Sequence, residues 1–200
     1  MCAFRSLSPA YVNALEIIAV LLGLANIVLL VRRSIWNYPF GLLMVALYAD
    51  IFFTTKLYSD ALLQLFFFGI QLFGWWAWAR AGGGEHKVDV ERLTWPARVA
   101  WVAMIAATSF AWGTIMHTYT DASYPWWDAV LAMASIAAQI LLARRRIENW
   151  VLWIAVDAAA IPLYLAKNLP LTAGLYMLFL VLCVLGLREW ARAEREAQAA

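Results

Sequence analysis

Residues 144–164 read RRRIENWVLWIAVDAAAIPLY, and they are the clearest sign of the kind of helix this chain forms. Three arginines are followed by an apolar run of about 18 residues, roughly the length of helix that crosses a bilayer core about 30 Å thick. Asp157 lies near the middle of that run. A carboxylate at that depth costs at least a few kcal/mol unless it faces a protein interior or a wet cavity. We therefore predict that Asp157 has a functional role on a membrane-spanning helix.

The whole chain has the composition of an integral membrane protein. It is 65% hydrophobic and 14% charged, with a mean hydropathy of +0.72, whereas soluble domains are about 25% charged. One transmembrane domain over residues 1–200 is expected, all α-helical with seven spans. The expected spans are 10–31, 35–55, 59–78, 95–117, 126–143, 149–166 and 171–190, followed by a short charged helical tail. Residues 82–92, which begin with three glycines, are predicted to be a flexible linker.

Positive charge predicts how the spans are oriented. If successive ends and loops alternate sides, 12 of the 15 Lys and Arg residues fall on one side. Cytoplasmic loops are enriched in these residues, so the N-terminus is predicted outside and the C-terminus inside. We interpret the Arg144–Arg146 run as part of this topology signal rather than as a site.

The sequence repeats itself when position 32 is placed on position 144, an offset of 112. From 32 to 80, 13 of 49 ungapped positions are identical to their counterparts, among them Arg32, Asn37, Gly74 and Trp78. The predicted units are a first three-helix repeat (10–80), a linker helix (95–117) and a second repeat (126–192). An odd linker helix gives both repeats the same direction, which is typical of transporters with a substrate site near the midplane.

Polar and aromatic side chains inside the spans are the candidates for that site. They are Gln64, Phe68, Gln71, Asn149, Trp150, Trp153, Asp157, Tyr164 and Tyr176. An aromatic cage with one carboxylate suits a cationic ring, through cation–π attraction of about 0.5–2 kcal/mol per ring. Each polar group also has a structural alternative. The glutamines can hold helices together, and Asn149, like Asn37, stands where a helix start needs a cap.

Five segments resemble the PnuC family of bacterial vitamin transporters. They are YPWWD (124–128), RRIENWVLW (145–153), LTAGLY (171–176), GLREW (186–190), and LLQLFFF with GWWAW between residues 62 and 78. The resemblance implies a SWEET-like bundle that imports nicotinamide riboside across the inner membrane by facilitated diffusion, with trapping by a cytoplasmic kinase. It also implies a homotrimer. A side-chain amide on the third span, together with Trp150 and Trp153 on the sixth span, would then hold the nicotinamide and the ribose.

Two positions leave the substrate open between relatives. Gln71 stands where nicotinamide riboside members of the family often have Asn, and Asp157 stands where several of them have Asn. Relatives within the family look specific for thiamine or riboflavin. Thiamine also carries a fixed positive charge, whereas riboflavin is larger and neutral, so a carboxylate suits riboflavin less well. Proton coupling through Asp157 is a further alternative to simple diffusion.

Other classes of function find little support in the residues. His86 and His117 lie in loops or at helix ends, and Cys2 and Cys183 show neither a disulfide framework nor metal-ligand spacing. An intramembrane enzyme would need a nucleophile with a base, or a metal cluster, at membrane depth. We therefore expect no catalytic residue, no cofactor and no nucleic-acid partner, and expect a small-molecule substrate and membrane lipid as partners.

Overall fold

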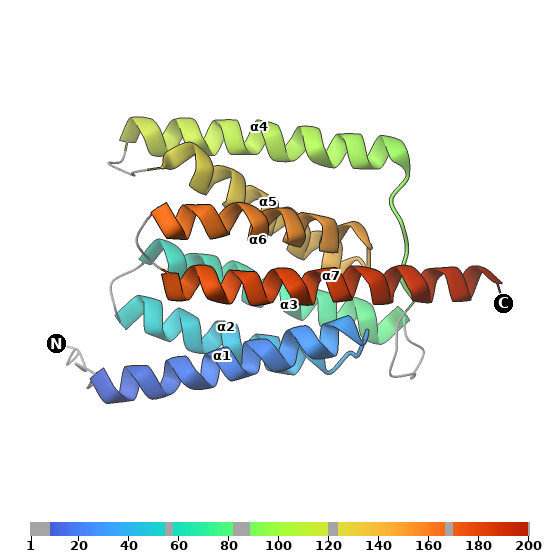
Figure 1. The fold of residues 1–200 in the computed structure, drawn as a ribbon, viewed down its shortest axis with the longest axis horizontal. Helices are drawn as coiled ribbons and strands as arrows, with labels where there is room; N and C mark the ends of the chain where they lie inside the picture. Colours follow the sequence, from blue (N-terminus) through green and yellow to red (C-terminus); the bar gives the residue numbers. More distant parts are fainter. Residues whose placement is uncertain (1–8, 55–57, 82–88, 120–123, 167–169, 200) are drawn as a thin grey trace. The chain divides into compact units, whose positions relative to one another are not determined.

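The computed structural model describes residues 9–54, 58–81, 89–119, 124–166 and 170–199. Within these ranges the chain forms seven α-helices and no strand, and an isolated bridge joins Glu91 to Arg146 (Figure 1). The helices are α1 (Pro9–Val31), α2 (Asn37–Thr54), α3 (Tyr58–Ala81), α4 (Trp95–Tyr119), α5 (Pro125–Ala143), α6 (Glu148–Ala166) and α7 (Pro170–Ala199). The prediction of an all-helical chain with seven helices is confirmed for the described part.

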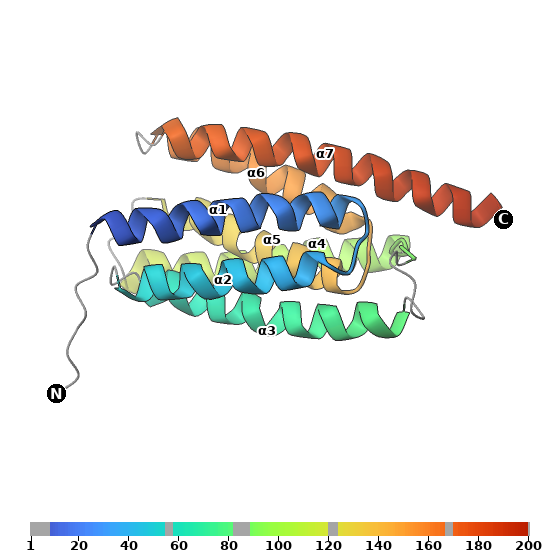
Figure 2. The same ribbon diagram turned by 90° about the horizontal axis from the view of Figure 1, so that it is seen from below.

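Most helix ends lie close to their predicted positions. The exceptions are α3, which continues to Ala81, and α7, which continues through the charged tail to Ala199 without a break (Figure 2). The predicted tail is therefore not a separate helix. It is the last part of α7.

The chain divides into two compact units, Met1–Val88 and Asp89–Ala200. In the first unit, α2 packs against both α1 and α3. Its core contains the rings of Tyr38 and Trp78, both almost fully buried, which meet edge to face with centroids 5.3 Å apart. Three consecutive helices thus form one antiparallel bundle whose middle member is the middle helix in sequence.

In the second unit, α4 packs on α5, α5 on α6, and α6 on α7. The buried face of α5 is made largely of alanines, including Ala134, Ala137 and Ala138. Small residues let helix backbones approach closely, which is how helices in membranes commonly pack. Near the start of α5, Trp127 Nε1 donates a hydrogen bond to the carbonyl of Ala159 at 3.1 Å.

The corners between α1 and α2 and between α5 and α6 have the same backbone geometry. Arg33 and Arg145 both adopt a left-handed conformation, each with φ of 58°. The amide of Ser34 donates to Leu29 O at 2.9 Å, and that of Arg146, its counterpart in the sequence repeat, donates to Leu141 O at 2.9 Å. Bonds of this kind close a helix end that leaves through a left-handed residue.

Just after each corner comes an aromatic residue, Tyr38 or Trp150, whose ring packs against a glycine of another helix. Trp150 meets Trp190 edge to face at 5.5 Å in the second unit, as Tyr38 meets Trp78 in the first. A Cβ on Gly186 would lie 2.5 Å from the Trp150 ring. A Cβ on Gly74 would lie 2.6 Å from the Tyr38 hydroxyl. Local geometry therefore repeats at the same offset as the sequence.

Among the described residues, two helices, α4 and α5, are long and apolar enough to cross a membrane, judged by length and composition alone. Large apolar side chains of α4 are exposed, including Val102, Phe110 and Ile115. In water such a surface would be unusual, so its natural surroundings are lipid or another protein.

The predicted flexible linker is partly wrong. Residues 82–88 lie outside the described part of the chain, but residues 89–93 are held against the α5–α6 corner. Glu91 receives a hydrogen bond at its carbonyl from the Ile147 amide and donates its own amide to Arg145 O, both at 3.0 Å. Charge and neighbouring glycines suggested a solvated loop, whereas Glu91 pairs with arginines of the corner and Arg92 pairs with Glu194 of α7.

Candidate functional site

Asp157 of α6 is buried and faces α7. Both Asp157 and Cys183 are only 3% exposed, and the Cys183 thiol donates a hydrogen bond to Asp157 Oδ2 at 3.4 Å. The prediction that Asp157 faces a protein interior is confirmed. Its carboxylate lies on the face of α6 that also carries Val156 and Ala160, both buried.

Sequence reasoning missed Cys183, because no polar residue stands three or four positions from it on its own helix. The partner lies on the neighbouring helix instead. One signal was available in the repeat, since Cys183 is the counterpart of Gln71 at the offset of 112. Both side chains are buried, Gln71 on α3 and Cys183 on α7.

Asn149 and Trp150 begin α6 and are completely buried. Asn149 Nδ2 donates to Arg146 O at 2.6 Å, just as Asn37 Nδ2 donates to Ser34 O at 2.7 Å. The structural alternative for these asparagines, holding the helix start, is therefore observed. Within the described residues, however, Asn149 Oδ1 and Trp150 Nε1 are buried without a hydrogen-bond partner.

The other candidates of the second unit are less buried. Trp153 follows on the same face of α6 as Asn149 and is half-buried. Tyr176 of α7 is also half-buried and meets Phe179 with centroids 6.0 Å apart. The backbone of Tyr164 belongs to α6, but its side chain lies outside the described part of the structure.

Gln71 forms the polar centre of the first unit. Its side chain is 6% exposed and lies against Gly41, where an added Cβ would come very close to Gln71 Oε1. The same Cβ would lie 2.7 Å from Asn26 Nδ2, which donates to Asn37 O at 2.7 Å. An amide from α1 and another from α3 thus meet over a glycine of α2.

The remaining candidates on α3 are more open. Gln64 is half-buried and Phe68 is 36% exposed. The structure therefore groups the candidates into two sets, one in each unit: Gln64, Phe68 and Gln71 on α3, and Asn149, Trp150, Trp153, Asp157 and Tyr176 on α6 and α7.

The Arg144–Arg146 run does more than mark topology. Arg146 Nη1 lies 2.8 Å from a carboxylate oxygen of Glu91, and Arg145 Nη1 donates to Asp89 O at 3.2 Å. Glu148 accepts the Leu93 amide at 3.1 Å and pairs with Arg98 of α4 at 2.7 Å. We call this set, residues 89–93 and 98 bound to residues 145–148, the clasp, because it fixes the start of α4 to the α5–α6 corner.

Comparison with known proteins identifies the family. A family model described as "Nicotinamide mononucleotide transporter" matches residues 13–192. The chain belongs to this family of membrane transporters, and the resemblance to PnuC proteins seen in the sequence is confirmed.

The relatives carry two different substrate names. The nicotinamide riboside transporter PnuC of Escherichia coli K12 is 28% identical over 91% of this chain and 87% of that protein. The riboflavin/roseoflavin transporter RibM of Streptomyces davaonensis is 29% identical, over 92% and 87%. A PnuC of Neisseria mucosa is 30% identical, over 88% and 71%.

A solved structure shares the fold. The crystal structure of the vitamin B3 transporter PnuC superposes on this chain with a TM-score of 0.75 and 29% sequence identity. The match covers 92% of this chain and 83% of that one. The fold is therefore that of a helical membrane transporter.

Proposed function

We propose that this protein carries nicotinamide riboside across the bacterial inner membrane by facilitated diffusion, with phosphorylation by a cytoplasmic kinase trapping the product. The buried carboxylate of Asp157 is the observation that carries the proposal. Nicotinamide riboside has a permanently charged pyridinium ring, and an anionic group in a poorly solvated interior attracts a cation much more strongly than it would in water. The relatives named as nicotinamide riboside transporters support the same substrate.

Two unpaired polar atoms at the start of α6, about two helical turns before Asp157, support a binding site on this helix. Asn149 Oδ1 is an acceptor and Trp150 Nε1 is a donor, and both are buried without a partner in the described residues. Buried polar groups are nearly always hydrogen-bonded, so a bound solute or water is the natural partner of each. Within the second unit, Trp153, Tyr164 and Tyr176 are proposed as further substrate contacts. In the first unit, the proposed substrate contacts are Gln64, Phe68 and Gln71 of α3.

The proposed architecture is a pair of parallel three-helix repeats joined by α4, as in SWEET transporters, within one domain. It is supported by the corners and glycine contacts that match between the two repeats. Seven crossings with most Lys and Arg on one side favour an outside N-terminus and a cytoplasmic C-terminus. We further propose a homotrimer, to which the exposed apolar side chains of α4 can contribute an interface.

Binding measured by calorimetry on the purified protein tests the substrate. We expect nicotinamide riboside to bind, thiamine and riboflavin to bind more weakly or not at all, and Asp157→Asn to weaken nicotinamide riboside by at least about tenfold. Asp50→Asn is the matched control, because Asp50 is an exposed carboxylate on α2. If Asp157→Asn leaves the affinity unchanged, the carboxylate does not select the cation.

Riboflavin is the second candidate, because RibM is as similar to this chain as the PnuC relatives are. Riboflavin is neutral and larger, so its ring would gain no charge attraction from Asp157. If riboflavin binds more tightly than nicotinamide riboside, the transporter class stands and the proposed substrate is wrong.

Uptake into vesicles without a kinase tests the transport mode. Facilitated diffusion predicts that internal and external substrate concentrations become equal, with no change when the proton gradient is dissipated. Accumulation above the external concentration that collapses with the gradient would instead indicate proton coupling through Asp157.

A further inference from the structure

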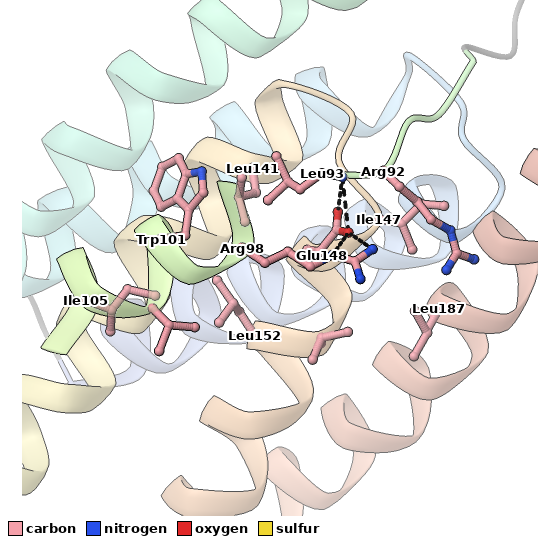
Figure 3. Close-up of a pocket in the computed structure, with 12 residues that line it drawn as sticks. Arg92, Leu93, Arg98, Trp101, Ile105, Leu141, Ile147, Glu148, Leu152 and Leu187 are labelled. Atoms are coloured by element: carbon pink, nitrogen blue, oxygen red, sulfur yellow. Dashed lines mark hydrogen bonds and ion pairs between the residues drawn. The ribbon is translucent and has the colours of Figure 1, made fainter. Parts of the chain in front are cut away.

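A groove of about 340 Å³ opens in the second unit between α4 and α6 (Figure 3). It exists because α5 packs against both helices, whereas α4 and α6 make no close backbone approach in the described part of the chain. Its volume lies within the range of small-molecule sites, about 300–1,000 Å³. The groove contains none of the candidate substrate residues.

The walls are apolar over most of their length. The apolar lining includes Trp101, Val102 and Ile105 of α4 and Val151 and Leu152 of α6. Leu141 of α5, which is almost fully buried, also lines the groove. Val102 and Val151 are both more than half exposed, so the groove is open to the surroundings of the helices.

Charged side chains of both signs gather at the end of the groove where the clasp lies. Arg92 and Arg98 both line it, beside Glu148 (Figure 3). Arg98 uses Nε and Nη2 for Glu148, and Arg92 uses Nε for Glu194. Each guanidinium has five N–H donors, so both retain donors beyond those that these carboxylates accept.

We propose that this groove binds one anionic phospholipid of the cytoplasmic leaflet, with an acyl chain along the apolar walls and the phosphate at Arg92 and Arg98. In a membrane, an apolar groove open to the lipid phase is filled by hydrocarbon. The two arginines, next to the Arg144–Arg146 run, add selectivity because basic pockets between helices on the cytoplasmic side attract anionic headgroups. The proposal rests on the orientation proposed above but not on the substrate.

Two faces of α6 would then contact different molecules, a lipid and the substrate. Glu148, Val151 and Leu152 face the groove, whereas Asn149, Trp153 and Asp157 lie on another stripe of the helix. A lipid in the groove would therefore contact the same helix that carries the proposed substrate site, on a different face.

Native mass spectrometry of the purified protein, taken from nanodiscs of equal phosphatidylglycerol and phosphatidylcholine, tests the proposal without any substrate. We expect the wild type to retain one phosphatidylglycerol per chain, with a preference over phosphatidylcholine on the order of tenfold. Arg92→Gln combined with Arg98→Gln should abolish the preference. Val102→Trp, which fills the apolar part and leaves the arginines intact, should abolish retention of either lipid.

Arg192→Gln is the matched control, because Arg192 is an exposed arginine of α7 that pairs only with Glu196 among its described ion-pair contacts. It should keep the wild-type lipid count and preference. Equal retention of both lipids by the wild type would overturn the proposal. So would retention of phosphatidylglycerol by Val102→Trp, or a change of oligomeric mass in that variant, which would show that a second copy of the chain fills the groove.

Discussion

The α1–α2 and α5–α6 corners share one backbone conformation, but different residues contact each of them. Both turn through a left-handed arginine, and both have an asparagine that bonds the carbonyl three residues before it. The difference lies at two positions. Ser34 and Trp36 of the first corner are replaced by Arg146 and Glu148 in the second.

Those two replacements create the clasp. Arg146 pairs with Glu91 and Glu148 pairs with Arg98, so the second corner holds the start of α4. Trp36, in contrast, is 57% exposed. The comparison teaches that the repeated residues specify the turn, and that the two residues which differ add the ion pairs to Glu91 and Arg98.

The largest effect is expected where a ring lies on a glycine. Gly186→Ala should lower the free energy of unfolding by about 1–3 kcal/mol, because the added methyl would overlap the Trp150 ring and the buried ring has no space to move. Gly74→Ala should act in the same direction through Tyr38. Thermal unfolding of the detergent-purified variants measures both.

Gly174→Ala and Gly69→Ala are the matched controls on the same two helices, since nothing lies within 4 Å of an added Cβ at either position. They should be neutral or slightly stabilising, because Ala is the better helix former by up to about 1 kcal/mol. Equal behaviour of Gly186→Ala and Gly174→Ala would refute the ring contact.

The second effect tests the clasp. Glu148→Ala should destabilise the protein by about 1–3 kcal/mol, because it leaves Arg98 and the Leu93 amide without their acceptor. Trp36→Ala, at the same position of the other corner, should change stability by less than about 0.5 kcal/mol. Thermal unfolding followed by circular dichroism compares them, and an equal loss in both would contradict the assigned difference.

The third effect separates structure from binding. Asn37→Ala and Asn149→Ala should each cost about 1 kcal/mol of stability, since each loses one hydrogen bond to a carbonyl. Only Asn149→Ala should also weaken nicotinamide riboside, by about threefold to tenfold. A calorimetric affinity that falls equally in both variants would mean that Asn149 acts through the fold alone.

The smallest effect concerns the left-handed Arg145. Arg145→Gly removes the Cβ penalty of this conformation, worth up to about 1 kcal/mol, but loses the contacts with Asp89 O and Glu91, so its stability should stay within about 0.5 kcal/mol of wild type. A gain of about 1 kcal/mol in thermal unfolding would count against the clasp.

Much of the fold could be predicted from the sequence. Apolar runs of the length of a membrane span give the helices, and the internal repeat identifies the two corners as counterparts. Asp157 could be predicted as buried because an ionised group in the middle of an apolar run needs a protein environment.

Contacts between helices could not be predicted in the same way. Helical periodicity shows which side chains share a face, but not which face of another helix lies opposite, so the Cys183 partner of Asp157 was missed. Glu91 and Arg92 were assigned to a linker because their charges suggested solvent. Their partners, Arg146 and Glu194, lie on elements that come much later in the chain.

The bond between Arg92 and Glu194 also orders events during synthesis. These two residues are 102 positions apart, so Arg92 leaves the ribosome long before its carboxylate partner exists. The first corner, in contrast, closes with bonds between neighbours and can form as soon as α2 has begun. The last turns of α7 therefore bind the segment before α4 late in synthesis, and a nascent chain that stops at Trp190 would lack the Arg92–Glu194 ion pair.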